Sequence, residues 1–168
     1  HNVASVTRTA AGRYRVTFAV AMPAAGKVLI IDDSNTIRRS AEIFLRQGGY
    51  EVVLAEDGFD ALAKVTDHDP ELIFCDILMP RLDGYQTCAI IKRNPRFAGV
   101  PVIMLSSKDG LFDKARGRMV GSQDYLTKPF TKDQLLRAVE QHRRVRPPAA
   151  AHAEEGTART IRKTPVVD

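Results

Sequence analysis

Four short polar motifs each follow an apolar run in this sequence, and their side chains are the ones that could do chemistry. They are the adjacent Asp32 and Asp33, then Asp76, Ser106 and Lys128. Taken singly, each is an ordinary loop residue, since loops favour Asp and Ser. Three carboxylates brought together repel one another unless a cation neutralises them, and Lys128 supplies only one positive charge. The remaining negative charge and the hard oxygen ligands favour Mg²⁺.

A carboxylate beside Mg²⁺ and a lysine is also a plausible nucleophile toward phosphorus. Asp32 and Asp33 are adjacent and form a natural metal-binding pair. Asp76 stands alone after the apolar residues 72–75, in a loop that Pro80 and Gly84 shape. We therefore assign the nucleophile to Asp76.

Alternating strands and helices must position these motifs. From residue 27 onward, short apolar runs alternate with helical segments, which is the pattern of βαβ units and a mainly parallel sheet. Ser34 and Thr131 are suited to cap the first and last helices. The carboxyl ends of parallel strands share one edge, where ligands bind. The expected strands are residues 27–31, 51–55, 72–75, 101–105 and 124–127, and helices follow each of them, the fourth over 109–119 and the last over 131–144.

The distribution of charge argues against a nucleic-acid role. The chain has 168 residues and a formal charge of +5, but residues 27–145 hold 18 basic and 17 acidic side chains. The excess lies mostly outside that range, and no aromatic residues interleave with the basic ones as a stacking platform needs. We therefore expect no nucleic-acid partner.

Three segments are expected along the chain. Residues 1–26 are interpreted as an N-terminal extension, disordered or foreign to the natural protein, residues 27–145 as the folded domain, and residues 146–168 as a disordered tail. The longest charge-free stretches have 11 residues, short of the ~20 that span a bilayer, so no membrane insertion is expected. The two cysteines lack metal or disulfide spacing and suggest buried thiols in the reducing cytoplasm.

Four motifs in order resemble the receiver domain of two-component response regulators. They are residues 27–34 (KVLIIDDS), 74–80 (FCDILMP) with 83–84 (DG), 102–107 (VIMLSS) and 127–130 (TKPF). The resemblance covers residues 27–145. It implies an α/β fold of the flavodoxin-like (βα)5 type, a doubly wound parallel sheet with strand order 2-1-3-4-5.

The resemblance also implies roles at the acidic site. Asp76 is the expected phosphoacceptor, and Mg²⁺ is the expected cofactor, held by Asp33, Asp76 and the backbone carbonyl of Leu78. Asp32 is expected to bind the metal through water or to assist. Leu78 and Lys108 occupy positions that tune the lifetime of the phosphate; an apolar Leu78 favours a longer lifetime, whereas Lys108 is open to either effect.

Lys128 is expected, by the same resemblance, to bridge to the phosphoryl oxygens, with a cis peptide bond to Pro129. Ser106 is expected to donate a hydrogen bond to the phosphoryl group, and Tyr125 to act as the aromatic switch. Tyr85 and Phe112 are exposed-aromatic candidates for a docking patch, with core and interface weighed equally.

Further segments resemble the chemotaxis-type regulators of type IV pilus twitching motility. This closer resemblance implies a chemotaxis-like histidine kinase as phosphodonor. It also implies a pilus-regulating partner on the face of the fourth helix, fifth strand and fifth helix. The matching segments are residues 37–39, 57–64, 80–88 and 105–114.

Other functions remain as alternatives. A phosphorelay shuttle, or a receiver with another output, would share every motif. An aspartate-based phosphotransferase usually places its nucleophile in an Asp-x-Asp arrangement after the first strand, whereas Asp32 and Asp33 are adjacent here. A flavin carrier needs a phosphate loop at that point, where this acidic pair would repel a phosphate. We therefore expect a phosphoacceptor signalling protein rather than an enzyme that turns over external substrates.

Overall fold

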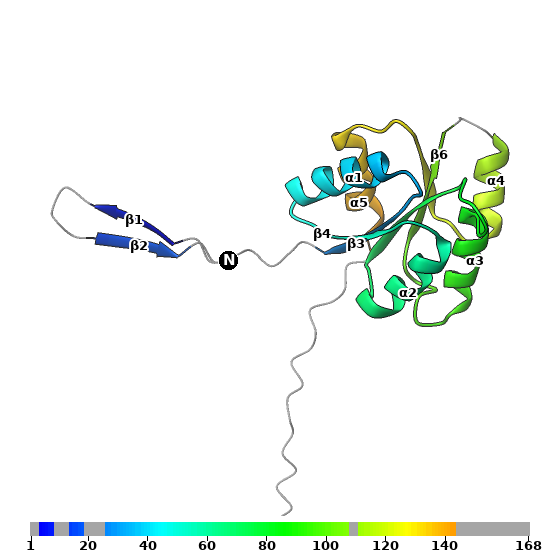
Figure 1. Cartoon of the computed structure of the whole chain (residues 1–168), viewed down its shortest axis with the longest axis horizontal. Helices are drawn as coiled ribbons and strands as arrows, with labels where there is room; N and C mark the ends of the chain where they lie inside the picture. The colour runs from blue at the N-terminus through cyan, green and yellow to red at the C-terminus, as the bar shows by residue number, and fades with distance from the viewer. Residues whose placement is uncertain (1–3, 9–13, 19–25, 108–110, 144–168) are drawn as a thin grey trace, which may run out of the picture.

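The computed structural model describes residues 4–8, 14–18, 26–107 and 111–143 (Figure 1). The expected tail at 146–168, like Lys108, lies outside these residues. The expected domain therefore falls almost entirely within the described part of the chain.

Five parallel strands form the central sheet, in the order that the sequence motifs imply. The apolar runs at residues 27–31, 72–76 and 102–106 are buried along nearly their whole length, as in strands covered on both faces, whereas the edge strand at residues 124–127 is exposed or half-buried. The predicted strand order 2-1-3-4-5 is confirmed. Across the sheet, the strands are β4 (Glu51–Ala55), β3 (Lys27–Ile31), β5 (Leu72–Asp76), β6 (Val102–Ser106) and β7 (Asp124–Thr127).

Five helices cover the two faces of the sheet (Figure 1). The helices α1 and α5 pack on one face through Ala41, Leu45, Leu135 and Val139. The other face is covered by α2 and α3, which contribute residues such as Val65. The five helices are α1 (Asn35–Gln47), α2 (Gly58–His68), α3 (Gly84–Arg93), α4 (Leu111–Met119) and α5 (Lys132–His142).

Tyr85 is buried in the same core cluster as Val65, with a relative exposure of 5%. Of the two roles considered for Tyr85, core packing is therefore the one that the structure shows. The side chain of Phe112 lies outside the described residues.

Hydrogen bonds from side chains start the helices where the sequence predicts. Ser34 Oγ accepts from the Ile37 N–H, and Thr131 Oγ1 accepts from the Gln134 N–H in a full capping box. Asp83 forms a second capping box at the start of α3. Such caps satisfy N–H groups that have no partner within the helix.

Asp76 and Ser106 are the last residues of their strands, one residue further than the sequence pattern predicts. The cause is parallel pairing, which aligns Asp76 with Leu105 and Ser106 with Thr127. The backbone of each residue is consequently fixed by strand pairing rather than lying in a loop.

Two further strands occur near the N-terminus, within the expected extension at residues 1–26. β1 (Ala4–Arg8) pairs antiparallel with β2 (Tyr14–Phe18). Both segments are rich in β-branched or aromatic residues, which favour strands. No strand had been expected here, because the apolar runs that guided the prediction begin at residue 27.

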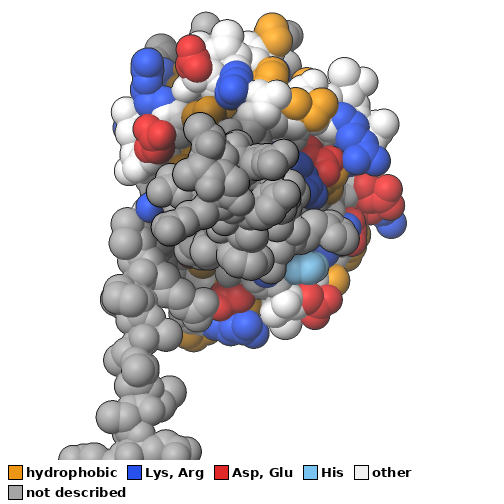
Figure 2. All heavy atoms as spheres, turned by 90° about the vertical axis from the view of Figure 1, so that its left-hand side faces the viewer, with side chains coloured by type: hydrophobic (Ala, Val, Ile, Leu, Met, Phe, Trp, Pro, Cys, Tyr) orange, Lys and Arg blue, Asp and Glu red, His pale blue; other side chains and the backbone are white. Residues whose placement is uncertain are grey.

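Charged side chains of both signs are visible on one face of the molecule (Figure 2). On the face that Figure 2 shows, acidic and basic side chains are interspersed rather than gathered by sign. This agrees with the near balance of charge in residues 27–145. Among the residues that the structure describes, no helix is long and apolar enough to cross a membrane.

Candidate functional site

The carboxyl edge of the sheet brings three acidic side chains together. Oxygen atoms of Asp32, Asp33 and Asp76 all lie within 4.8 Å of one another. Asp32 and Asp33 follow β3, and Asp76 ends the adjacent strand β5. Because these neighbouring strands are parallel, residues far apart in sequence meet at one edge.

Asp32 is fully buried and is held by two hydrogen bonds, one from the residue that caps α1 and one from a side chain on α1. Its Oδ1 accepts a hydrogen bond from the Ser34 N–H at 2.8 Å. Its backbone carbonyl accepts one from Arg38 Nη1 at 2.7 Å. Asp33, in contrast, is exposed. The acidic pair thus divides into one buried, fixed carboxylate and one that faces solvent.

Lys128 reaches across the sheet edge to both buried carboxylates. Its Nζ lies 3.0 Å from Asp76 Oδ1 and 3.2 Å from Asp32 Oδ2. Lys128 follows β7, two strands from β5, so tertiary structure alone creates the contact. One ammonium group therefore balances part of the charge of three carboxylates.

This arrangement shifts the pKa values of the central groups. Burial, followed by the charge of Asp32, raises the pKa of Asp76 to about 6, although Lys128 opposes the change. For Lys128, burial acts to lower the pKa, but the hydrogen bond to Asp76 and the charge of Asp32 outweigh it and raise the pKa. Asp76 is thus a carboxylate that is costly to ionise until further positive charge arrives.

The loop after Asp76 is packed closely against α3. The Gly84 N–H donates to the carbonyl of Ile77 at 2.9 Å. A Cβ on Gly84 would lie 2.2 Å from the carbonyl oxygen of Asp76, so only glycine fits here. The Leu78 N–H donates to Asp76 Oδ1 at 3.3 Å, while the Leu78 side chain is 71% exposed.

Ser106 and Lys128 are joined through the backbone. The Lys128 N–H donates to the Ser106 carbonyl at 2.6 Å. The Lys128–Pro129 bond is cis, the geometry that the resemblance implies. Ser106 itself is buried, with 2% exposure, at the end of β6.

Tyr125 lies near the start of β7, away from the strand end that leads to Lys128 and the acidic cluster. Its ring is partly buried, and Lys114 Nζ lies 4.5 Å from the ring centroid. The strands of the sheet therefore bring Asp32, Asp33, Asp76 and Lys128 into one cluster, with Ser106 connected to it and Tyr125 at the adjoining surface.

The acidic cluster fits a Mg²⁺ ion by the chemistry of its donors. All three side chains offer hard carboxylate oxygens, and Mg²⁺ binds through one or two carboxylates while keeping water ligands. The exposure of Asp33 leaves the cluster open on one side. No soft ligand lies within it among the residues described, which argues against zinc or copper.

Two arginine contacts, one at this site and one in the loop beside it, were not predicted from the sequence. Arg38 Nη1 donates a hydrogen bond to the Asp32 carbonyl. The one sequence signal for this contact is that Arg38 lies on α1, six residues after Asp32. Arg81, in the loop after Asp76, has a positive φ of 67° and pairs with Asp57 at 2.7 Å. Neither contact has a motif of its own, because each depends on how separate segments of the folded chain meet.

Comparison with known proteins agrees with this fold. The family model for the response regulator receiver domain matches residues 28–140. Protein PilG of Pseudomonas aeruginosa is 66% identical over 116 residues, which cover 69% of this chain and 86% of that protein.

Solved structures give the same result. The chemotaxis protein CheY4 of Vibrio cholerae aligns with a TM-score of 0.67 and 33% identity, covering 69% of this chain and 97% of that one. A receiver domain of a Francisella response regulator aligns with a TM-score of 0.64 and 34% identity, covering 69% and 94%. This chain therefore belongs to the family of response regulator receiver domains.

Proposed function

We propose that this chain is a phosphorylation-switched response regulator that controls type IV pilus twitching motility. The observation that carries the phosphorylation step is the shared contact of Lys128 with Asp76 and Asp32 beside the open Asp33. The 66% identity with PilG supports the assignment to twitching motility.

In this proposal, Asp76 is the phosphoacceptor of a chemotaxis-like histidine kinase. A carboxylate oxygen of Asp76 forms a bond to phosphorus while the N–P bond of the donor's phosphohistidine breaks, and the released imidazole takes up a proton. Asp33 and the backbone carbonyl of Leu78 would join Asp76 in holding Mg²⁺, and Asp32 would bind the ion through water or assist. When bound, Mg²⁺ neutralises charge on the phosphoryl oxygens.

Lys128 and Ser106 respond to the new phosphoryl group. Lys128 can exchange its contact with the Asp76 carboxylate for one with a phosphoryl oxygen, because its ammonium already lies 3.0 Å from the attacking side chain. Ser106 donates its hydroxyl to another phosphoryl oxygen. Tyr125 then changes its rotamer and alters the adjoining surface.

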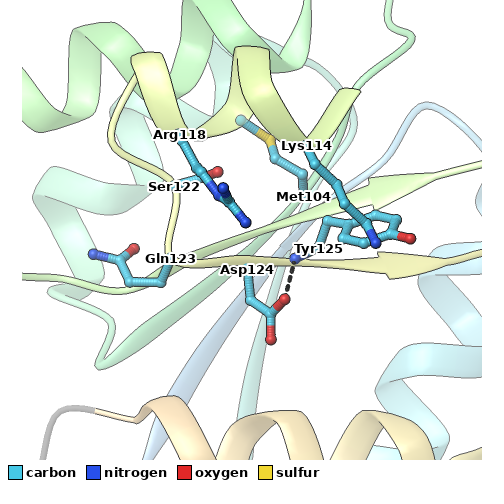
Figure 3. A pocket seen from close by; sticks show the side chains of 7 residues that line it. All are labelled: Met104, Lys114, Arg118, Ser122, Gln123, Asp124 and Tyr125. Atoms are coloured by element: carbon cyan, nitrogen blue, oxygen red, sulfur yellow. Dashed lines mark hydrogen bonds between the residues drawn. The ribbon is translucent and has the colours of Figure 1, made fainter. Parts of the chain in front are cut away.

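The partner surface in this proposal includes a pocket between α4 and β7 (Figure 3). Lys114 and Arg118 extend from α4 toward β7, where Asp124 and Tyr125 lie. The presence of Tyr125 in the wall supports this face as the place where the switch is read. The lining residues are Met104, Lys114, Arg118, Ser122, Gln123, Asp124 and Tyr125.

The proposal includes action in the cytoplasm, without nucleic-acid binding. Cys75 and Cys88 are both buried and free, which fits a reducing compartment. The chain acts by binding partners rather than by turning over substrates, apart from its own phosphorylation and dephosphorylation.

Phosphate analogues test the first half of the proposal. With Mg²⁺, acetyl phosphate or beryllofluoride is expected to shift amide resonances from Ser106 to Tyr125. Asp76→Asn is expected to abolish the response, whereas Asp67→Asn, a change of an exposed acid on α2, is expected to leave it intact. An unchanged response in Asp76→Asn would overturn the site assignment.

A genetic replacement tests the second half. In the bacterium that carries this chain, Asp76→Asn at the native locus is expected to reduce the twitching zone on agar, with Asp67→Asn as the matched control. Normal twitching with Asp76→Asn, in cells where the protein accumulates to its usual level, would count against the pilus output and favour a different receiver role.

A further inference from the structure

Three side chains on one face of α3 reach α4 and the turn that follows it. Tyr85, Cys88 and Lys92 are spaced three and four residues apart, so they line one side of the helix. We call them the α3 stripe. Their contacts join Tyr85 to the guanidinium of Arg116 at 4.6 Å, Cys88 Sγ to the Val120 carbonyl at 3.6 Å, and Lys92 Nζ to Gln123 Oε1 at 3.3 Å.

Gly84, the residue just before this stripe, is packed on the backbone of the proposed phosphoacceptor. Gly84 begins α3, and its N–H bonds to the Ile77 carbonyl. The Asp76 carbonyl lies so close that a Cβ on Gly84 would stand 2.2 Å from it. A close-packed contact of this kind transmits displacement rather than absorbing it. Movement of the Asp76 backbone is therefore passed to the first turn of α3.

The other end of the stripe holds the segment that leads into β7. Lys92 Nζ donates to the Val100 carbonyl at 2.5 Å, to the Ala98 carbonyl at 3.3 Å and to Gln123 Oε1. Gln123 Oε1 also accepts from the Val102 N–H at 2.7 Å. Burial lowers the pKa of Lys92, as fits an ammonium partly withdrawn from water. Lys92 thus ties α3, the start of β6 and the α4–β7 turn to one point.

Gln123 and its neighbour Ser122 also form one wall of the pocket in Figure 3. This wall comes from the turn between α4 and β7, whereas the acidic cluster lies at the carboxyl ends of the strands. The α3 stripe therefore runs from the backbone of Asp76 to the wall of the pocket.

We propose that the α3 stripe is a second coupling route from Asp76 to the partner pocket, with Lys92 as the positioning residue at its far end. It acts beside the route through Ser106 and Tyr125. The inference rests on the proposed function, because it concerns how phosphorylation at Asp76 reaches the pocket.

The test compares Lys92→Met with Lys64→Met in the full chain. Methionine keeps most of the aliphatic stem and removes the ammonium. Lys64 is a matched control, since it also donates to a backbone carbonyl, that of Leu54, and pairs with Asp60, but it lies on α2. Lys92→Arg keeps the charge and serves as the conservative variant.

Each variant is titrated with beryllofluoride and Mg²⁺ while amide resonances are followed. In Lys92→Met, we expect the analogue-induced shift at residues 122–124 to fall to about half or less of that in the unchanged chain. The shift at Ser106 and the midpoint of the titration should stay within about twofold, since Lys92 touches neither group. Lys64→Met should respond like the unchanged chain, and Lys92→Arg should recover part of the shift.

The outcomes separate this inference from the proposed function. An unchanged chain that fails to respond would contradict both. A full response at residues 122–124 in Lys92→Met would overturn the inference alone, as would an equal loss in Lys64→Met. Loss of the Ser106 shift together with the pocket shift would mean that Lys92 acts on the acidic site, which also overturns it.

Gln123→Ala provides a second variant if Lys92→Met folds poorly. It removes the acceptor at the other end of the same contact without changing charge. We expect it to lower the analogue-induced shift at residues 122 and 124 while sparing Ser106. A full response in this variant would contradict the proposed route.

Discussion

The ammonium of Lys128 lies between two buried carboxylates, 3.0 Å from Asp76 Oδ1 and 3.2 Å from Asp32 Oδ2. The side chain of Lys128 is only 17% exposed, and those of its partners are 0% and 4% exposed. A cation so placed compensates charges that water cannot reach, so its removal would leave buried carboxylates without a partner. The same contact is the one that we propose changes on phosphorylation.

Removal of this cation should destabilise the protein more than removal of a surface one. We expect Lys128→Ala to lower the free energy of unfolding by about 3 kcal/mol at pH 7.5 without Mg²⁺, because two buried carboxylates lose their partner. Lys27→Ala, which breaks an exposed 3.6 Å pair with Glu51, should cost no more than about 1 kcal/mol. Urea denaturation measures both, and equal losses would contradict the role of Lys128.

Lys128→Ala should also separate phosphate binding from its consequences. In this variant, beryllofluoride can still bind to the carboxylates and Mg²⁺, but no ammonium group links the end of β7 to the phosphoryl site. We expect beryllofluoride to bind with a reduced shift at Ser106 and Tyr125. Normal partner binding by this variant would be evidence against a bridging role.

The raised pKa of Asp76 predicts a pH-dependent stability. The folded chain holds a proton on Asp76 between the ordinary pKa of 3.8 and about 6, whereas the unfolded chain releases it. The folded state therefore binds more protons in that window, and the contribution of Asp76 to stability falls as pH rises through it. The loss is complete about one pH unit above this pKa, where Asp76 is ionised in both states.

Asp76→Asn should remove this loss. In the absence of Mg²⁺, we expect it to stabilise the protein at pH 7.5 by roughly 1 to 3 kcal/mol, with a smaller gain at pH 5. Urea denaturation at both pH values gives the comparison. A gain that does not depend on pH would show that ionisation of Asp76 is not its cause.

Mg²⁺ should stabilise the chain through Asp33. At ten times its dissociation constant, a ligand adds about 1.4 kcal/mol to the free energy of unfolding. Asp33→Asn should abolish this gain yet change the metal-free stability little, because Asp33 is exposed. Thermal melts with and without Mg²⁺ test this, and an undiminished rise in Tm for Asp33→Asn would exclude it as a ligand.

The two thiols should be inert while the protein is folded. Burial raises the pKa of Cys88 to about 11, against a smaller opposing effect of Lys92, and burial likewise raises the pKa of Cys75 well above its usual value. The thiolate is the reactive form, so at pH 8 only about 0.1% of Cys88 can react. A thiol reagent should modify both cysteines in urea and neither rapidly without it.

Gly84→Ala should disturb the proposed site directly. The added Cβ would meet the Asp76 carbonyl, which is backbone and cannot turn aside. We expect a loss of about 1 to 3 kcal/mol and a weaker response to beryllofluoride. Gly49→Ala, where φ is 88° and the space is open, should cost about 1 kcal/mol and leave the response unchanged.

Much of this fold could be predicted from local sequence. The buried apolar runs at 27–31 and 72–75, the caps at Ser34 and Thr131 and the alternation of elements are all local patterns, and they depend only on side-chain type and spacing. The strands at Ala4–Arg8 and Tyr14–Phe18 were missed, because short polar alternation is a weak signal beside long apolar runs.

The sequence by itself determined which residues could do chemistry at the strand ends, since Asp32, Asp33, Asp76 and Lys128 each follow a recognisable strand. Only the tertiary structure decided which of these side chains are buried, which is exposed and which are paired. It buried Asp32, left Asp33 exposed and shared one ammonium between Asp32 and Asp76. Burial and charge pairing depend on atoms that lie up to 96 residues apart in the chain, and no local pattern encodes them.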